Sequence, residues 1–320
     1  MQALMQDKAM AVARSGGPFR LTIAMAAYNE ARDIGTVLRT FMELEIEADW
    51  ELLVVDDGSD DGTGDIAEAH AVGALDGRLR VVRHPRNLGK GAAIRTVIAQ
   101  ARGTHLLVFD ADSEYDPADI VRLVEPVRRG RAEVVYGVRA RGFDTLHPTF
   151  VHGLGNLVMT MAANLVFGSW ISDLHTCLKL LPLPLLRAMC LRETGFGLDT
   201  EITAEMLRLG FRPYEVPVSY VGRSSDEGKK VGFGDALRSF WLIAKVRARG
   251  AMKRGERDRS LAPAVSFGQA PGLSLVGRER RASAATVGRP RVGRPSARWP
   301  TRRAIVTARR YGEPVSSRVH

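Results

Sequence analysis

The chain has 320 residues, 45% of them apolar and 26% charged, a composition ordinary for a soluble protein with a substantial core. Its formal net charge of +10 is unevenly distributed, because residues 251–320 hold 16 of the 46 basic and 4 of the 36 acidic residues, a net +12, which leaves −2 on residues 1–250. The basicity belongs to the C-terminal segment, so no specific nucleic-acid partner is expected for the rest.

Cysteine usage bears on the compartment. Cys177 and Cys190 are the only cysteines, and no signal sequence precedes the first apolar run, which predicts a reducing, cytoplasmic setting. Although Cys177 lies near His175, two cysteines thirteen residues apart match no zinc pattern. A buried structural cysteine is the favoured interpretation.

The predicted elements begin after a flexible leader, residues 1–18. Apolar runs of strand type then alternate with helical patterns. The strands are predicted at 19–30, 50–59, 79–85, 104–112 and 132–142, and the helices at 31–45, 62–72, 89–103 and 117–130. This pattern is typical of an α/β fold with a mostly parallel central sheet and helices on both faces.

The next segment, residues 145–172, contains no Asp, Glu, Lys or Arg. Its polar residues Asn156, Thr160 and Asn164 recur every four positions, which predicts an amphipathic helix with an uncharged polar side. Its apolar run is interrupted by polar residues and glycines, so no membrane-spanning helix is predicted.

Residues 233–250 predict a second amphipathic helix, which carries Arg and Lys and is of the type that can lie on an anionic membrane. Both helices are candidate membrane contacts, with ordinary core packing as the alternative. From 251 to 320 the repeated GRP, the scattered Arg, Ser and Ala and the missing periodicity predict a basic disordered tail.

Polar clusters directly follow three of the predicted strands. They read AYNE, DDGSDDGT and DADSEYD. Ligands of parallel sheets bind beyond the carboxyl ends of the strands, so the three clusters should converge on one crevice.

The third cluster is the most informative one. Asp110, Asp112 and Glu114 stand at alternate positions, and like charges this close need a compensating cation. Magnesium uses one or two carboxylates together with substrate phosphates, so a metal and nucleotide site is predicted, with a simple strand-end turn as the alternative. Asp116, which precedes Pro117, is assigned to the cap of the next helix.

Two other motifs leave alternatives open. DDGSDDGT is also compatible with an Asx-rich turn in which Asp60 or Asp61 caps a helix. Lys90 in NLGKGAA lies at a helix start, where phosphate can bind, but the phosphate-loop pattern is absent.

Taken in order, these motifs, together with VYGVRARG, DLHTCLKLL, GFGLDTEI and SYVGRSSDEGKKVG, resemble family-2 glycosyltransferases of the branch similar to dolichyl-phosphate (polyprenyl-phosphate) mannose and glucose synthases. The resemblance runs from residue 21 to residue 249. It implies a GT-A fold and an inverting enzyme that uses Mg²⁺ or Mn²⁺. The enzyme would move a hexose from a nucleotide-diphosphate sugar, with UDP favoured over GDP, to a polyprenyl or dolichyl phosphate at the cytoplasmic membrane face.

The resemblance also assigns site residues. It implies donor contacts at Tyr28, Glu30, Asp57, Asp110 and Ala111, metal ligands at Asp110, Asp112 and Glu114, and a catalytic set of Asp112, Arg139, Arg223 and Lys229. A phosphate acceptor is already anionic, so no general base is nominated.

Two departures from the family pattern stand in these motifs. Ala26 occupies a position where many relatives have Pro, and Glu114 one where some relatives carry Gln or Ser. The second could alter the charge balance at a metal.

The predicted organisation is one domain over 19–250, with a nucleotide-sugar half, 19–142, and an acceptor- and membrane-facing half, 143–250. Two alternatives to the lipid-acceptor function remain at this point. One is a family-2 transferase with a soluble or polysaccharide acceptor. The other is a non-catalytic protein that a basic tail anchors to membrane or nucleic acid.

Overall fold

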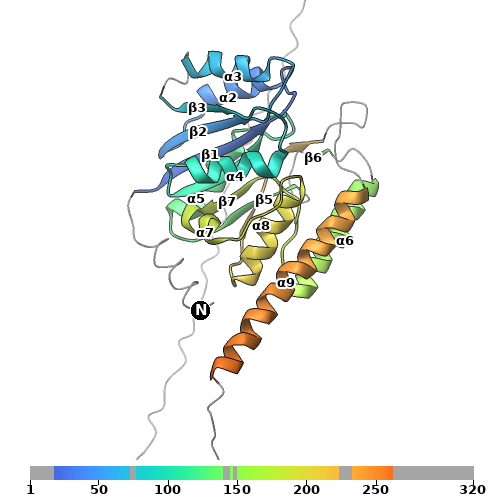
Figure 1. Cartoon of the computed structure of the whole chain (residues 1–320). Coiled ribbons are helices and arrows are strands. Elements are labelled where there is room, and N and C mark those ends of the chain that lie inside the picture. The colour runs from blue at the N-terminus through green and yellow to red at the C-terminus, as the bar shows by residue number, and fades with distance from the viewer. Residues whose placement is uncertain (1–17, 73–76, 140–144, 147–149, 223–232, 262–320) are drawn as a thin grey trace, which may run out of the picture. The chain divides into compact units, whose positions relative to one another are not determined.

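Figure 1 shows a computed structural model of the chain. All the residues that the structure describes belong to one compact unit. The described residues are 18–72, 77–139, 145–146, 150–222 and 233–261. The predicted leader, apart from residue 18, and residues 262–320 of the predicted tail lie outside them.

A seven-stranded sheet of order β3-β2-β1-β4-β7-β5-β8 forms the centre. All neighbouring strands are parallel except β7, which runs antiparallel to both β4 and β5. The predicted mostly parallel sheet is therefore confirmed. Its strands are β1 (Arg20–Ala27), β2 (Asp49–Asp56), β3 (Leu79–Arg83), β4 (His105–Asp110), β5 (Val135–Val138), β7 (Lys179–Pro182) and β8 (Tyr214–Pro217).

Helices cover both faces of this sheet. The chain moves from β1 through β2 to β3 in one direction and then returns across β1 to β4, so right-handed connections place α2 and α3 on one face and α4 on the other (Figure 1). The first helices are α2 (Ile34–Met42), α3 (Thr63–Val72), α4 (Lys90–Gln100) and α5 (Asp119–Arg128). A small second sheet pairs β6 (Thr145–Leu146) with β9 (Tyr220–Val221).

The core forms because the strands are apolar on both sides. The Phe109 ring of β4 meets the Phe41 ring of α2 edge-on, with centroids 5.3 Å apart, and Trp50 of β2 lies 6.4 Å from Phe41. All three side chains are buried. These contacts fix α2 on the sheet over β2 and β4.

The strand order reverses between β1 and β4, which is where ligands bind in sheets of this kind. The register pairs Ala27 of β1 with Asp56 of β2, and Ala26 with Asp110 of β4. The acidic residues that end β2 and β4 therefore flank the end of β1.

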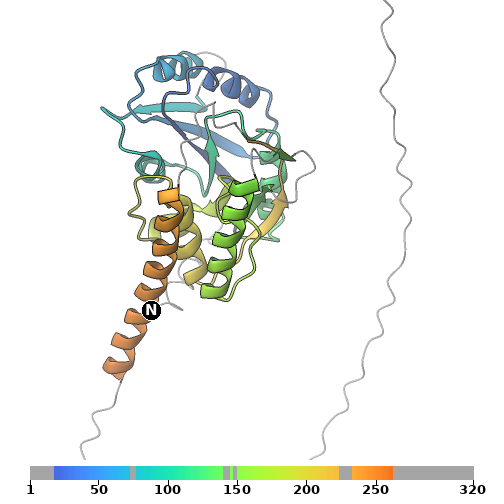
Figure 2. The same cartoon turned by 90° about the vertical axis from the view of Figure 1, so that its right-hand side faces the viewer.

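The second half of the chain adds α6 (Phe150–Phe167), α7 (Leu183–Ala188), α8 (Gly197–Arg208) and α9 (Phe233–Leu261). Figure 2 shows α6, α8 and α9 side by side. The Arg238 guanidinium of α9 lies 2.6 Å from the Glu193 carboxylate, and Arg249 lies 3.3 Å from Glu205 of α8. Because both carboxylates are buried, these pairs hold α9 in place.

Helix α9 corrects the predicted start of the tail at residue 251, because the helix continues to Leu261. The residues concerned, AMKRGERDRSL, are mostly good helix formers, and the first proline comes only at position 263. Hydrophobic periodicity could not show this extension, since these residues are largely charged.

The beginning of α4 is closed by the loop that precedes α8. The N–H groups of Gly91 and Ala92 donate to the Thr194 carbonyl oxygen at 2.7 and 3.2 Å. Gly89 has φ +95, and a Cβ there would lie 2.3 Å from the same oxygen. The backbone of Thr194 therefore occupies the helix N-terminus, and position 89 requires glycine.

We expect Gly89→Ala to lower the free energy of unfolding by about 3 kcal/mol, because the methyl group would strain a left-handed backbone and also meet a backbone oxygen. Gly130→Ala is the matched control, since Gly130 has φ +65 with nothing within 4 Å of a Cβ. It should lose only about 1 kcal/mol. Urea denaturation measures both, and equal losses would contradict the close contact at Thr194.

Candidate active site

The loop after β1 is joined to the loop after β2. The backbone N–H of Asn29 donates to Ser59 Oγ at 3.0 Å, and that of Glu30 donates to Thr63 Oγ1 at 2.9 Å. Asn29 adopts φ 54, which turns the chain sharply at this point. Tyr28 and Glu30, two predicted donor contacts, are therefore held in a loop at the carboxyl end of β1.

Asp60 and Asp61 were the two predicted capping residues. The side chain of Asp61 accepts the backbone N–H of Thr63, the first residue of α3. Its carboxylate accepts from the Thr63 N–H at 3.0 Å and from the Ala31 N–H at 3.0 Å. Burial acts to raise the pKa of Asp61, but the hydrogen bonds from Thr63 and Ala31 outweigh it and lower that pKa. One carboxylate thus ties the start of α3 to the loop after β1.

Asp57 is buried, and its carboxylate holds the loop before α4. It accepts from the N–H groups of Leu88 and Gly89 at 3.0 and 2.7 Å, and His84 Nδ1 lies 2.6 Å from Oδ1. Beside the predicted donor contact, Asp57 thus has a positioning role that sequence reasoning did not foresee. The signal was absent because its partners lie about thirty residues away along the chain.

Lys90, the first residue of α4, contacts the acidic cluster directly. Its Nζ lies 2.7 Å from Asp110 Oδ1 and 3.5 Å from Asp199 Oδ2. Burial disfavours the charged amine, but Asp110 and Asp199 more than compensate and raise the pKa of Lys90 well above its usual value. Lys90 is therefore a cation that lies against the first carboxylate of the cluster.

A second buried lysine, Lys179, also contacts Asp199, with its Nζ 3.4 Å from Asp199 Oδ1. Lys179 Nζ donates to the Asp199 and Leu174 carbonyl oxygens at 3.0 and 3.1 Å. Burial lowers the pKa of Lys179. Burial also acts to raise the pKa of Asp199, but the charges of Lys179 and Lys90 outweigh this effect, so the pKa of Asp199 is lowered. A row of alternating charges thus runs from the end of β4 into the core and consists of Asp110, Lys90, Asp199 and Lys179.

Asp112 and Glu114 lie in the turn after β4, with Ala111 buried between Asp110 and Asp112. The Glu114 N–H donates to Asp112 Oδ1 at 3.3 Å, and the Tyr220 hydroxyl donates to Glu114 Oε2 at 2.9 Å. The acidic turn is thereby attached to β9.

The donor set of this turn fits a hard divalent cation, because carboxylate oxygens are the ligands that Mg²⁺ and Mn²⁺ take. No group of three or more His, Cys, Asp or Glu side chains able to hold a metal occurs among the described residues. Magnesium commonly uses one or two carboxylates and completes its shell with phosphates and water. Asp112, with Asp110 beside it, can supply such a partial site.

Arg139 lies at the end of β5 and forms a two-point ion pair with Asp173. Its Nε and Nη2 donate to the two Asp173 oxygens at 2.7 and 2.8 Å, and Asn156 Nδ2 donates to Asp173 at 2.9 Å. Burial acts to raise the pKa of Asp173, yet Arg139 lowers it to about 2. The Arg139 guanidinium also lies 5.0 Å over the Tyr220 ring.

Tyr220 therefore joins the two charged parts of the crevice, since it contacts Glu114 through its hydroxyl and Arg139 through its ring. Arg223 and Lys229, the other predicted cations, lie outside the described residues. Asp173, Lys90 and Asp199 were not in the predicted set, although each belongs to one of the motifs on which the family resemblance rests. Cys177 is buried, as predicted.

His175 joins three helices behind Asp173. Its Nδ1 lies 3.1 Å from Asn156 Oδ1 of α6, and its Nε2 lies 3.2 Å from Thr200 Oγ1 of α8 and 3.4 Å from Ser239 Oγ of α9. Burial lowers the pKa of His175 to about 4, so the ring is neutral near pH 7.

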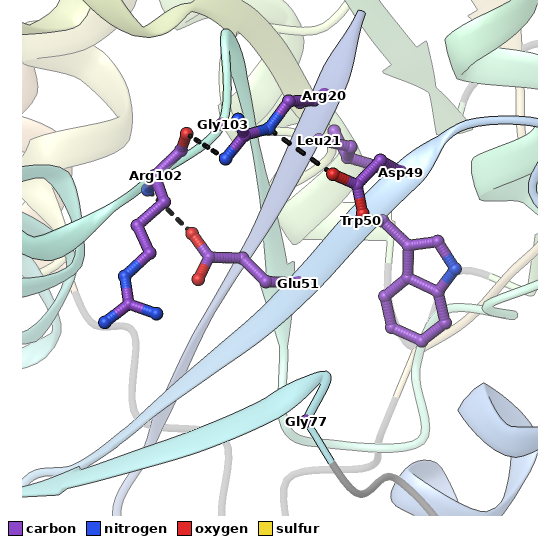
Figure 3. A pocket seen from close by; sticks show the side chains of 8 residues that line it. All are labelled: Arg20, Leu21, Asp49, Trp50, Glu51, Gly77, Arg102 and Gly103. Carbon is purple, nitrogen blue, oxygen red and sulfur yellow. Dashed lines mark hydrogen bonds and ion pairs between the residues drawn. The ribbon is translucent and has the colours of Figure 1, made fainter.

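A pocket of charged residues lies at the opposite, amino-terminal end of the strands (Figure 3). Several of its charges are paired within the protein: Arg20 lies 3.4 Å from Asp49, and Glu51 lies 3.0 Å from Arg80. This pocket is separate from the acidic residues at the carboxyl ends of β2 and β4.

Comparison with known families agrees with this geometry. Residues 22–187 match the family described as Glycosyl transferase family 2. Glycosyltransferase AglD of Haloferax volcanii is 30% identical over 240 residues, which are 72% of this chain and 38% of that protein. Undecaprenyl-phosphate mannosyltransferase of Micrococcus luteus is 29% identical over 220 residues, 67% of this chain and 88% of that protein.

Glycosyltransferase AglJ of Haloferax volcanii is matched over 64% of its length, so the chain spans less than two thirds of AglD and of AglJ. Among solved structures, glucosyl-3-phosphoglycerate synthase from Mycobacterium tuberculosis, crystallised with Mn²⁺, UDP and glucosyl-3-phosphoglycerate, superposes with a TM-score of 0.55 at 20% identity, over 75% of this chain and 83% of that one. Mannosyl-3-phosphoglycerate synthase from Rubrobacter xylanophilus gives 0.54 at 19% identity, over 81% and 80%. The predicted GT-A fold is confirmed.

The environment of His175 predicts a pH dependence of stability. The unfolded ring takes up a proton below its usual pKa of 6.5, whereas the folded ring does so only near 4. Stability is therefore fully present above pH 6.5 and is lost as the pH falls toward 4, by about 3 kcal/mol. Urea unfolding at several pH values between 7 and 4 measures the free energy of unfolding of both proteins. That of His175→Gln should fall less over this range than that of the wild type, by the same amount. Equal falls in the two proteins would contradict the prediction.

Proposed function

Because the chain belongs to glycosyl transferase family 2 and is a glycosyltransferase, we propose that it moves a hexose, with inversion, from a nucleotide-diphosphate sugar to a polyprenyl phosphate. A UDP-sugar is the favoured donor and GDP-mannose the second choice. The observation that carries the proposal is the contact of Tyr220 with both Glu114 and Arg139, because it brings together the acidic turn and a guanidinium of the kind that can bind phosphate.

The donor is proposed to lie across the carboxyl ends of β1, β2 and β4. The nucleoside would be contacted by Tyr28, Glu30 and Asp57. Asp57 would also act indirectly, because its carboxylate positions the loop before α4. Asp110 and Ala111 would lie against the sugar and diphosphate. The joined loops after β1 and β2 support this assignment, since they present a fixed surface to the donor.

Asp112, with Asp110 beside it, is proposed to hold Mg²⁺ or Mn²⁺, whereas Glu114, the third ligand expected from the sequence, forms no three-carboxylate group with them in the described part of the chain and accepts the Tyr220 hydroxyl. Bound there, the ion would act as a Lewis acid that stabilises the negative charge of the departing diphosphate. The two carboxylates of Asp110 and Asp112 would otherwise repel an anionic donor. Lys90 offsets part of that charge from within the protein, because it lies 2.7 Å from Asp110.

Arg139 is proposed to bind an acceptor or donor phosphate. Its pairing with Asp173 fixes the guanidinium before substrate arrives, so little side-chain freedom would be lost on binding. Arg223 and Lys229 are proposed as further cations of the same kind. The anionic acceptor phosphate needs no proton removed, so the protein's task is to place the two substrates and to stabilise the leaving group.

One comparison supports the acceptor assignment. A matched relative is named as an undecaprenyl-phosphate mannosyltransferase and is covered over 88% of its length. A prenyl chain remains in the bilayer, so the enzyme is proposed to act as a peripheral protein at the cytoplasmic face. None of the helices in the described part of the chain is both long and apolar enough to cross a membrane.

The acceptor class can be tested by product analysis. The protein, a divalent metal and undecaprenyl phosphate in detergent would be incubated with radiolabelled UDP-glucose or GDP-mannose. We expect label in the organic phase with one donor, in a lipid whose mass is that of undecaprenyl phosphate plus one hexose residue, with release of the nucleoside diphosphate. Label that reaches only water-soluble or polysaccharide acceptors would overturn the lipid assignment and leave the family-2 alternative with a soluble acceptor.

Asp112→Ala should lower the transfer rate by roughly 10³-fold, because it removes charge stabilisation at the leaving group. The free energy of unfolding should change by only about 0.5 kcal/mol, since the side chain lies in a partly exposed turn. Asp116→Ala, an exposed carboxylate of the same turn, is the matched control and should keep wild-type turnover. Wild-type turnover by Asp112→Ala would remove the basis of the site assignment.

A further inference from the structure

Helix α6 turns its polar residues toward the protein. Asn156 donates to Asp173 at 2.9 Å, Thr160 Oγ1 accepts the Leu174 N–H at 3.1 Å, and Asn164 Oδ1 accepts the Ile171 N–H at 2.8 Å. A surface helix of a globular protein ordinarily does the reverse and buries its apolar side. The uncharged polar stripe of α6 is thus an internal contact, which leaves the apolar stripe facing outward.

The outward side of α6 and the turn after it carry large apolar side chains. Exposed fractions are 46% for Leu154, 53% for Leu157 and 47% for Val158. They rise to 61% for Met161, 86% for Leu165 and 84% for Trp170. An apolar surface of this extent on a folded protein marks a contact with another surface.

Helix α9 extends this surface, because it lies beside α6 (Figure 2). Leu237 is 57% exposed, Phe240 41% and Trp241 53%, and Lys245 Nζ lies 3.9 Å above the Trp241 ring. These three residues and the six of the α6 region form what we call the docking face. It holds nine of the fifteen exposed large apolar side chains in the described part of the chain.

Charge selects the occupant of the docking face. Residues 145–172 carry no Asp, Glu, Lys or Arg, and residues 236–255 of α9 carry six Arg or Lys and no Asp or Glu. Arg238 and Arg249 form ion pairs with buried carboxylates of the protein, so four of these cations remain for contact with a partner. Two copies of the chain would bring these cations together, whereas an anionic lipid surface would attract them. Tryptophan and lysine beside an apolar stripe also match the boundary between lipid headgroups and acyl chains.

We propose that the docking face inserts into the surface of a bilayer that contains anionic lipid. The proposal rests on the proposed function, because it gives the lipid acceptor a route to the site. Asn156, on the inner side of α6, holds the Asp173 that fixes Arg139. The bilayer surface would thus lie against the helix that supports Arg139, the proposed phosphate-binding cation.

The test is co-sedimentation of the full chain with vesicles of phosphatidylcholine mixed with phosphatidylglycerol, and with vesicles of phosphatidylcholine alone. We expect binding to the mixed vesicles and weaker binding without phosphatidylglycerol. The variant Met161→Ser/Leu165→Ser/Trp170→Ser should bind the mixed vesicles at least roughly a hundredfold more weakly, because it removes most of the inserted apolar area. Val72→Ser is the matched control, since Val72 on α3 is 86% exposed, like Leu165.

A second measurement separates this proposal from the proposed function. The triple variant should transfer sugar to undecaprenyl phosphate in detergent at the wild-type rate and to the same acceptor in vesicles at a much lower rate. Wild-type vesicle binding by the triple variant overturns the docking face, whatever the activity. Absence of lipid-linked product from a vesicle-bound wild type overturns the acceptor and leaves the docking face standing. A wild-type dimer that the triple variant converts to a monomer, by light scattering, would assign the face to a second copy.

Discussion

The ion pair between Lys90 and Asp110 is the contact on which the site depends most. Asp110 ends β4, Lys90 begins α4, and Asp199, which lies 3.5 Å from the same amine, belongs to the first turn of α8. A buried charge is tolerated only where an opposite charge is held close to it. The sheet, α4 and α8 must therefore all be in place before any of these charges is stable, and the closed N-terminus of α4 keeps Lys90 in position.

Much of the first half of the fold could be predicted because its information is local. Strands such as β1 and β4 are continuous apolar runs, and the helices between them have clear apolar periodicity or glycine and aspartate boundaries. Strand β7 could not be predicted, because KLLP lies in a long apolar stretch without alternation and pairs with segments more than forty residues away. The direction in which α6 turns its apolar side was equally hidden, since periodicity reveals two sides of a helix but not which one is buried.

The candidate site divides in the same way. A dense pattern of carboxylates directly after a strand is visible in the sequence and consists of Asp110, Asp112 and Glu114. The fold places them where ligands of such sheets bind. Asp173 and Asp199 are single acidic residues in ordinary surroundings, and their importance comes from Arg139, Lys90 and Lys179, which reach them only in the folded chain. Asp57 is the opposite case. It belongs to a conspicuous acidic motif, but its carboxylate accepts hydrogen bonds from the backbone of the loop before α4.

The position of β7 has a consequence for how the chain folds. It comes from the second half of the sequence, yet it lies between β4 and β5 of the first half, and β5 reaches the rest of the sheet through it. A chain cut after residue 142 would leave β5 without its neighbour and expose the edge of β4 to pairing with other molecules. The two halves thus form a single cooperative folding unit with many contacts between distant segments, so completion of the sheet must wait for synthesis of the second half.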